Sequence, residues 1–261
     1  MGLNAAQIAR RQGKLTASRV ACLMTGDREK IHRLWLEMIG EELPEDLSHI
    51  WAVRLGECTE QLQLNWYEEK HRQEVTRRGE IVVHPDLEWA ACTLDGWITE
   101  LDCPLEVKHV GGREPLEVVI DRYMPQMQWQ MTVTRSSQCA LSIIVGANAP
   151  VVEFISYHGE YAVEMVKRGS MFMECVEQRR PPVELPAVPS PVDAKATYDM
   201  TGSNEWASYA VQWLDTHQAS IDNEESSKIL KAMVPPDAHK CHGHGVRITR
   251  DRAGRLSLRE G

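Results

Sequence analysis

The chain has 261 residues, a formal net charge of −9 and 43% hydrophobic residues. This length suits one large domain, or a domain of about 150–200 residues with an appendage. No apolar run approaches the ~20 residues that a membrane-spanning helix needs, and the N-terminus lacks the charged-then-apolar pattern of a secretory signal. We therefore expect no membrane partner.

The seven cysteines are scattered along the sequence, and no two of them form a Cys-x-x-Cys pair. An odd, scattered set in mostly apolar surroundings is typical of reduced thiols in a cytoplasm. The missing Cys-x-x-Cys pair argues against a zinc ribbon and against an iron–sulfur cluster. The sequence thus predicts a cytoplasmic protein without disulfides.

The acidic excess is unevenly spread. Residues 1–36 carry seven Lys or Arg against two acids, and residues 240–261 carry six against two. The negative charge therefore lies in the body of the chain, while both ends are basic enough to meet phosphates. Net charge alone does not exclude an anionic partner.

Helical patterns dominate the first part of the chain. A helix is expected over 3–12, and Thr16-Ala-Ser18 has the composition of a second helix start. Asp27 is expected to cap a third helix. The next helix is predicted over 53–70.

The helix predicted over 53–70 sets out two faces. Its apolar residues recur at helical spacing and predict a buried stripe made of Leu55, Cys58, Leu62 and Trp66. Glu57, Glu60 and Leu64 would then lie on a different face.

Strand-like segments follow at about 80–84, 89–98 and 103–110. A helix is predicted from Tyr123 to Thr134, with Pro125 tolerated in its first turn. Gln126 and Gln130 lie one turn apart on that helix.

Two further β-rich runs are expected at 139–145 and 151–157, and a helix at about 160–179 closes the domain. Strands mixed with flanking helices predict an α/β or α+β fold with a central mixed sheet.

The proline-rich stretch that follows predicts a stiff linker over 181–195. The expected domain spans 1–180, and 196–261 forms a C-terminal appendage. Ser203-Asn204 is expected to cap a helix to about 219, followed by a second helical stretch at 223–233. Alternating apolar residues around Asp251-Arg-Ala-Gly254 predict a basic β-hairpin at the end of the chain.

Two acidic residues and a lysine fall in neighbouring apolar runs. Asp95 lies in Thr93-Leu-Asp-Gly96, and eleven residues later Glu106 begins Glu-Val-Lys108. On a strand, Glu106 and Lys108 face the same side. An Asp-Gly pair is often a turn, and Glu-x-Lys is often a solvated pair, but here the flanks are apolar, and buried charges without a role are rare.

Two carboxylates and an amine on one edge suit a hard divalent cation beside a phosphodiester. Mg²⁺ prefers oxygen ligands with open water positions, and it lowers the pKa of water at such a site. A neighbouring lysine can orient the attacking water or neutralise charge as the bond breaks. The residues therefore predict metal-assisted phosphodiester hydrolysis. We expect one or two Mg²⁺ ions per site, with Mn²⁺ as a substitute.

Four motifs, in this order, resemble those of the phage lambda exonuclease and YqaJ-like viral recombinase family of PD-(D/E)xK nucleases. They cover roughly residues 8–180 and comprise Arg11-Gln-Gly-Lys-Leu-Thr-Ala-Ser18, Leu55-Gly-Glu-Cys-Thr-Glu60, Thr93-Leu-Asp-Gly96 with Leu105-Glu-Val-Lys108, and Met124-Pro-Gln-Met-Gln128. The resemblance implies a restriction-endonuclease-like core. Leu94 replaces the proline of the superfamily name, which should not affect ligation.

The resemblance also implies roles at the metal site. Asp95, Glu106 and the Val107 carbonyl would ligate the metal, and Lys108 would position the attacking water. Glu60 matches a helix carboxylate near the metals, with Glu57 as its nearest alternative and a solvated helix face as the structural alternative. Gln126 matches a glutamine that orients groups in the site, although ordinary helix polarity would also explain it.

Family members grip the 5′-phosphate of the strand that they degrade. Arg11 and Ser18 match two of those contacts, and a helix N-terminus with a nearby arginine does favour a phosphate. The alternative is a helix cap beside a surface arginine. Thr93 stands where the family often has Ser, and Arg113 is near, but not in register with, a further phosphate-binding arginine.

The resemblance implies a Mg²⁺-dependent 5′-to-3′ double-stranded DNA exonuclease that leaves 3′ single strands for phage-type recombination. It also implies a homotrimer, double-stranded DNA ends as substrate, a single-strand annealing protein as partner, and a phage or prophage origin in a bacterial cell. A restriction-like endonuclease or nickase with the same core, and a non-catalytic recombination scaffold, remain alternatives.

The appendage carries two open questions. Its basic end is expected to contact DNA or a partner protein. A tight group near its end, His239, Cys241, His242 and His244, could bind zinc, but its spacing is tighter than in a usual finger. A flexible, DNA-facing turn is the favoured interpretation.

Overall fold

A computed structural model describes residues 10–112, 114–191 and 201–261. The chain divides into two compact units, Met1–Ala194 and Lys195–Gly261. None of the helices in these described stretches is long and apolar enough to cross a membrane. The expected helix over 3–12 lies mostly outside the described residues.

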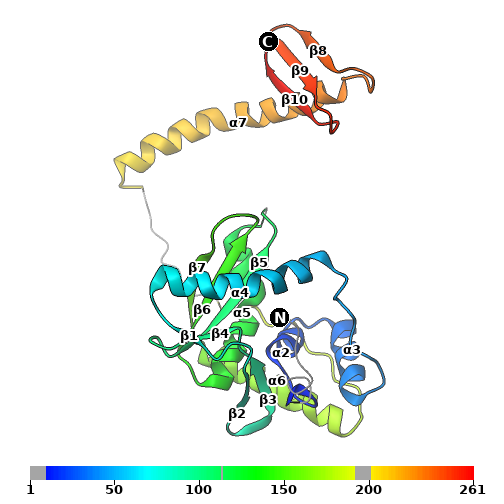
Figure 1. Cartoon of the computed structure of the whole chain (residues 1–261), viewed down its shortest axis with the longest axis vertical. Coiled ribbons are helices and arrows are strands. Elements are labelled where there is room, and N and C mark those ends of the chain that lie inside the picture. Colours follow the sequence, from blue (N-terminus) through cyan, green and yellow to red (C-terminus); the bar gives the residue numbers. More distant parts are fainter. Residues whose placement is uncertain (1–9, 113, 192–200) are drawn as a thin grey trace. The chain divides into compact units, whose positions relative to one another are not determined.

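A five-stranded mixed sheet forms the centre of the first unit, in the order β1-β4-β5-β6-β7 (Figure 1). Only β5 and β6 run parallel, and every other neighbouring pair is antiparallel. The strands are β1 (Val75–Thr76), β4 (Gly96–Ile98), β5 (Cys103–Val110), β6 (Gln138–Val145) and β7 (Val151–Ser156). The mixed sheet between helices confirms the predicted fold class.

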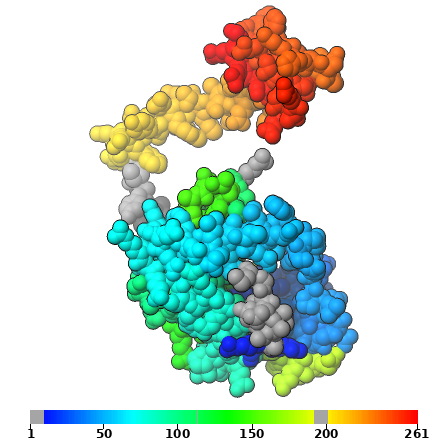
Figure 2. All heavy atoms as spheres, viewed as in Figure 1, coloured from blue at the N-terminus to red at the C-terminus, as the bar shows by residue number. Residues whose placement is uncertain are grey.

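Two long helices cover opposite faces of this sheet. One is α4 (Trp51–His71), whose Leu64 and Tyr67 pack on Leu105 and Val107 of β5. The other is α5 (Leu116–Thr134), which packs on the alternate residues of β6. In the space-filling view, α4 lies on the face toward the reader (Figure 2). Since side chains alternate along a strand, Glu106 and Lys108 project toward the α5 side.

The buried stripe that we predicted on the α4 helix is wrong. Cys58 and Leu62 are exposed, whereas Gln63, Leu64 and Tyr67 are buried. The helix packs on the sheet mainly through the face that carries Glu60, where Gln63 also hydrogen-bonds to the strands. Leu55 and Trp66 of the predicted stripe are only half-buried.

Helix α5 begins seven residues before the predicted start. Pro125 therefore lies inside the helix and not in its first turn. Proline has no N–H to donate to the carbonyl four residues earlier. That carbonyl, on Asp121, accepts a hydrogen bond from the Ser190 hydroxyl at 3.2 Å instead, which explains how the helix tolerates the proline.

The remaining elements of the first unit pack on one side of the sheet system. A two-stranded ribbon pairs β2 with β3, and three helices surround it in a shared core with the N-terminal part of the unit. These elements are α2 (Ala17–Met24), α3 (Arg28–Ile39), α6 (Gly159–Glu177), β2 (Ile81–His84) and β3 (Leu87–Thr93). Asp27 caps α3 as predicted, accepting a hydrogen bond from the Lys30 amide at 3.1 Å.

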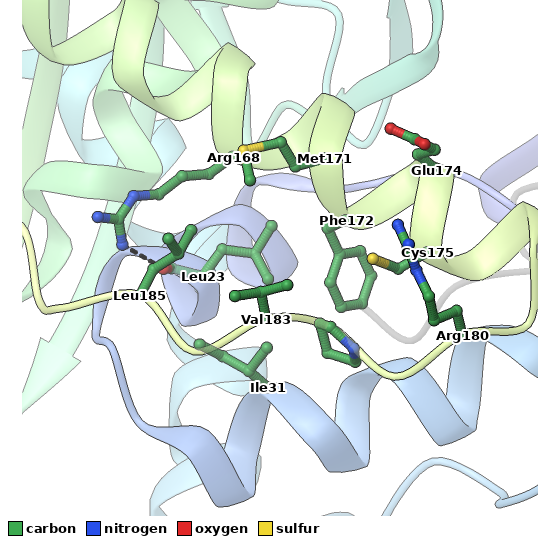
Figure 3. Close-up of a pocket in the computed structure, with 11 residues that line it drawn as sticks. Leu23, Ile31, Arg168, Met171, Phe172, Glu174, Cys175, Arg180, Val183 and Leu185 are labelled. Atoms are coloured by element: carbon green, nitrogen blue, oxygen red, sulfur yellow. Dashed lines mark hydrogen bonds between the residues drawn. The ribbon is translucent and has the colours of Figure 1, made fainter.

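The described part of the expected linker, 181–191, lies against the first unit in an extended conformation. The Val188 amide donates to the Met24 carbonyl at 2.9 Å, and Arg168 donates to the Pro186 carbonyl at 2.8 Å. This segment closes an apolar cavity of about 90 Å³ between α2, α3 and α6 (Figure 3). Proline keeps the segment extended, but its side chains are part of the packing.

The second unit consists of α7 and a three-stranded antiparallel sheet, β8 with β9 and β9 with β10. Its elements are α7 (Asn204–Ala232), β8 (Lys240–Gly243), β9 (Val246–Arg250) and β10 (Leu256–Glu260). Ser203 caps α7 as predicted, but one continuous helix replaces the two that we expected. The predicted hairpin is β9–β10, with β8 as an additional strand.

Candidate active site

Asp95 lies in the connection between two sheets. The run predicted as one strand over 89–98 is broken here, so that β3 belongs to the two-stranded ribbon and β4 to the central sheet. The half-buried Asp95 side chain accepts a hydrogen bond from the Val107 amide at 3.0 Å through Oδ2. This bond fixes the Asp95 carboxylate beside the middle of β5, at Val107, the residue between Glu106 and Lys108 in the sequence.

Glu106 is almost fully buried, with 1% of its surface exposed. Its Oε1 accepts hydrogen bonds from Gln126 at 2.6 Å and from the Lys108 ammonium, and its Oε2 accepts one from Gln130 at 2.5 Å. Charge-assisted hydrogen bonds of this kind compensate a buried carboxylate. Lys108 also lies over the Tyr123 ring, with Nζ 5.1 Å from the ring centroid.

The electrostatics of the site are unbalanced toward negative charge. Burial and the nearby Glu106 carboxylate raise the pKa of Asp95 to about 8. Burial opposes the charge on Lys108, but the carboxylates of Glu106 and Asp95 outweigh it, and the pKa of Lys108 lies above its ordinary value. The two adjacent carboxylates repel each other, and this repulsion contributes to the raised pKa of Asp95. A bound cation would relieve it.

Glu60 lies on the face of α4 that turns toward this site. Its side chain is half-buried and its charge contributes to the raised pKa of Asp95, whereas Glu57 is exposed. The structure thus brings Glu60, and not its alternative Glu57, close to the predicted metal ligands.

The donor set fits a hard divalent cation. Asp95, Glu106 and the main-chain carbonyl of Val107 would offer only oxygen atoms, as Mg²⁺ prefers. No group of three or more His, Cys, Asp or Glu side chains converges within the described stretches. A cation here would therefore depend on two carboxylates, a carbonyl and water, which is a usual arrangement for Mg²⁺.

A second group of residues gathers around the start of α2. Thr16 is the N-cap, and the exposed Ser18 hydroxyl lies 3.3 Å from the Thr16 hydroxyl. Burial and the nearby Arg19 guanidinium lower the pKa of Arg11. Two close guanidinium groups beside a helix N-terminus suit an anion. No hydrogen bond or ion pair among the described residues connects this group to Asp95.

Two other predicted contacts have different outcomes. The Thr93 hydroxyl is buried and makes no hydrogen bond within the described part of the chain, so it would have to become exposed before it could meet a phosphate. Arg113 lies outside the described residues.

Three site residues were missed by the sequence analysis. Gln130 donates to Glu106, and Gln63 joins α4 to β5 and β6 through the Lys108 carbonyl at 3.3 Å and the Ser142 hydroxyl at 3.1 Å. Arg19 accompanies Arg11. The one-turn spacing of Gln126 and Gln130 was the available signal for Gln130, since it places both amides on one helix face.

The cysteine and histidine group of the appendage does not converge. Cys241 pairs across from Ile248 and His242 across from Arg247, so the two side chains point to opposite faces of the sheet. His244 lies in the following turn. The seven cysteines carry free thiols.

The fold resembles solved exonuclease structures. An alkaline exonuclease, LHK-Exo, from Laribacter hongkongensis is 20% identical, with a TM-score of 0.56 over 67% of this chain and 94% of that one. Its complex with dAMP gives 21% identity with the same TM-score and coverage. A phage-related exonuclease from Haemophilus somnus 129PT is 11% identical, with a TM-score of 0.51 over 64% of this chain and 94% of that one.

A search of curated proteins finds no sequence match. One family does match: the sequence pattern of the YqaJ-like viral recombinase domain fits residues 7–137. That span contains α2 to α5, the two acidic residues, Lys108 and the glutamines. It covers half of the chain, and the structural neighbours agree with it. The chain therefore belongs to the YqaJ-like viral recombinase domain family.

Proposed function

We propose that the protein is a Mg²⁺-dependent double-stranded DNA exonuclease. It degrades one strand from 5′ to 3′ and leaves 3′ single strands for phage-type recombination by single-strand annealing. The observation that carries this proposal is the convergence of Asp95, Glu106 and Lys108, with Glu106 held by two glutamine amides. Family membership and the exonuclease fold support the same conclusion.

Each residue has a distinct task in this proposal. Asp95, Glu106 and the Val107 carbonyl would hold the cation, with Glu60 beside them. A bound cation would supply a water of lowered pKa and positive charge beside the phosphate. Lys108 orients the attacking water and offsets charge as the phosphodiester opens. Gln126 and Gln130 keep the Glu106 carboxylate in place.

The 5′-end preference rests on the group around the start of α2. Arg11 and Ser18 bind the terminal 5′-phosphate, where two guanidinium groups and free helix amides compensate its charge. Assembly as a homotrimer around duplex DNA, and action with a single-strand annealing protein, complete the proposal and follow from the family resemblance alone.

The decisive comparison is wild type against Lys108→Ala on linear duplex DNA, with and without Mg²⁺. We expect the variant to bind DNA but to hydrolyse it at least ~100-fold more slowly, the range for losing a positioned proton-transfer or charge-stabilising group. Lys167→Ala, on the exposed surface of α6, is the matched control and should keep full activity. Full activity of Lys108→Ala would overturn the mechanism.

The same assay separates the remaining alternatives. Cleavage of covalently closed circular DNA would identify an endonuclease or nickase, because an exonuclease needs an end. No hydrolysis by wild type with Mg²⁺ or Mn²⁺ would favour a non-catalytic scaffold. Equal rates on 5′-phosphate and 5′-hydroxyl ends would remove only the assignment of Arg11 and Ser18.

A further inference from the structure

The three-stranded sheet of the second unit has two chemically different faces. The register pairs Ile248 with Cys241 on one side and with Leu258 on the other. This row is apolar, and Ile248 is only 5% exposed. This row therefore forms the inner face of the sheet. Arg250 lies on the same face, and its guanidinium donates hydrogen bonds to the carbonyls of Ala238 and Pro235.

The opposite face carries only cationic, imidazole and hydroxyl side chains. Arg247 pairs across from His242 of β8 and from Arg259 of β10, and Thr249 pairs across from Lys240 and Ser257. We call these six residues the basic face: Lys240, His242, Arg247, Thr249, Ser257 and Arg259. No carboxylate belongs to it. Asp251 lies in the turn, and the Glu260 side chain points to the inner face, since it pairs with Val246.

The charges of the basic face are not neutralised by any ion pair among the described residues of the second unit. Lys240, Arg247 and Arg259 form no ion pair in the described part of the chain, although salt bridges are frequent in the first unit. Like charges directly across a strand pair repel each other. The sheet therefore keeps Arg247 opposite Arg259 at a cost in stability that an external anion would relieve.

The dimensions of the basic face suit an extended anion better than a single small one. Neighbouring strands lie about 4.8 Å apart, so the outer strands hold their side chains about 10 Å apart. A DNA strand carries one phosphate per ~3.4 Å of helix axis. The three strands, each with one cation on this face, can thus contact about three successive phosphates, and hydroxyl side chains are regular partners of phosphate oxygens.

We infer that the basic face of the second unit binds the phosphate backbone of DNA, as a site separate from the acidic centre of the first unit. The choice of DNA among polyanions rests on the proposed function. The contact is independent of base sequence, because the face offers charge and hydroxyl groups in a flat array. It gives the enzyme a second hold on its substrate or on the strand that it releases.

The test measures DNA binding of the full chain in the presence of a chelator, so that hydrolysis plays no part. Affinity for a short 5′-phosphorylated duplex and for the matching single strand is recorded as a function of salt. In Arg247→Gln/Arg259→Gln we expect weaker binding, and a slope of log affinity against log salt that is lower by about 1.8 for the duplex or about 1.4 for the single strand.

Two further variants separate a local contact from a general charge effect. Arg252→Gln/Arg255→Gln removes the same charge from the exposed turn between β9 and β10 and should leave the slope unchanged. Arg247→Lys/Arg259→Lys keeps the charge and should keep the slope. Thermal unfolding of all variants checks that the sheet remains folded.

An unchanged slope in a folded Arg247→Gln/Arg259→Gln variant would overturn the inference, as expected for a face that docks an acidic protein instead. Equal losses in the turn variant would also overturn it, because net charge would then explain the effect. Neither result touches the proposed nuclease activity, since the Lys108→Ala comparison measures hydrolysis separately.

Discussion

The two carboxylates of the candidate active site are held in unequal ways. Glu106 accepts hydrogen bonds on both oxygens from three side chains, whereas Asp95 accepts one, from the Val107 amide, within the described residues. Glu106 is therefore fixed in position, and Asp95 keeps an oxygen for a ligand. Such a site trades stability for function, because the charge of Asp95 is destabilised by burial and by Glu106.

Replacing Asp95 with Asn should expose this trade-off. Asn keeps the oxygen that accepts from Val107 but removes the repulsion with Glu106. We expect Asp95→Asn to abolish hydrolysis and to raise the free energy of unfolding in chelator near neutral pH by about 1 kcal/mol or more, since one pKa unit corresponds to ~1.4 kcal/mol. Denaturant unfolding of both proteins measures the difference.

Two comparisons make that result specific to the site. Glu57→Gln, on the exposed face of the same helix as Glu60, should change neither activity nor stability. Added Mg²⁺ should stabilise the wild type and not Asp95→Asn, because a ligand stabilises only a fold that binds it. A less stable Asp95→Asn would contradict the argument that the carboxylates repel each other.

At the scale of elements, the sequence predicts the strands and helices well and their environment poorly. Strands β2, β5, β6 and β7 and helices α4 and α6 lie close to their expected ranges, and α3 begins after its predicted cap, since each has a clear periodic pattern. The break at Asp95 was not visible, because Leu94 and Trp97 continue an apolar run across it. Only tertiary structure assigns β3 and β4 to different sheets.

The same limit applies to the candidate site. Asp95, Glu106 and Lys108 stand out because charges interrupt apolar strands. Gln130 does not, since a polar residue on a helix ordinarily faces solvent, and only the position of α5 against β5 reveals its bond to Glu106. The buried face of α4 was missed for a related reason: Gln63 is polar, yet it is buried and hydrogen-bonded to strand groups.

Gly96 connects the packing of β4 to the position of Asp95. A Cβ atom at Gly96 would lie 2.5 Å from Val75 Cγ1 and 3.2 Å from Leu64 Cδ2. The Asp-Gly pair is thus a close-packing device, not a turn. We expect Gly96→Ala to lower stability by about 1–3 kcal/mol, as for other overpacked sites, and to reduce hydrolysis by displacing the neighbouring Asp95.

A second glycine provides the control. A Cβ atom at Gly56 on α4 meets no atom of the described residues within 4 Å, and alanine is favoured over glycine in a helix by about 1 kcal/mol. Gly56→Ala should therefore stabilise the protein slightly. Chemical denaturation measures both variants, and a Gly96→Ala protein as stable and active as the wild type would refute the close-packing argument.

At the scale of the whole molecule, the segment 181–191 before the second unit is more than a simple linker. The extended segment 181–191 completes the core of the first unit, whereas the second unit has its own sheet with an apolar inner face. The two units also divide the chemistry: acidic groups gather at the sheet of the first, and the sheet of the second carries cations that form no ion pair among the described residues. Removing the second unit should therefore be possible without damage to the first.

Two truncations test where the first unit ends. Deleting 195–261 should leave its melting temperature nearly unchanged. Deleting 181–261 should also remove the Pro186 carbonyl from the buried Arg168, and a lost hydrogen bond to a charged group costs about 1.5–3 kcal/mol. Opening of the apolar cavity beside Leu23 and Phe172 adds to this cost.

Calorimetry should show a melting temperature lower by about 5 °C or more in the longer deletion, given ~2–4 °C per kcal/mol for a domain of this size. Equal melting temperatures for the two truncated proteins would show that 181–191 is a linker after all.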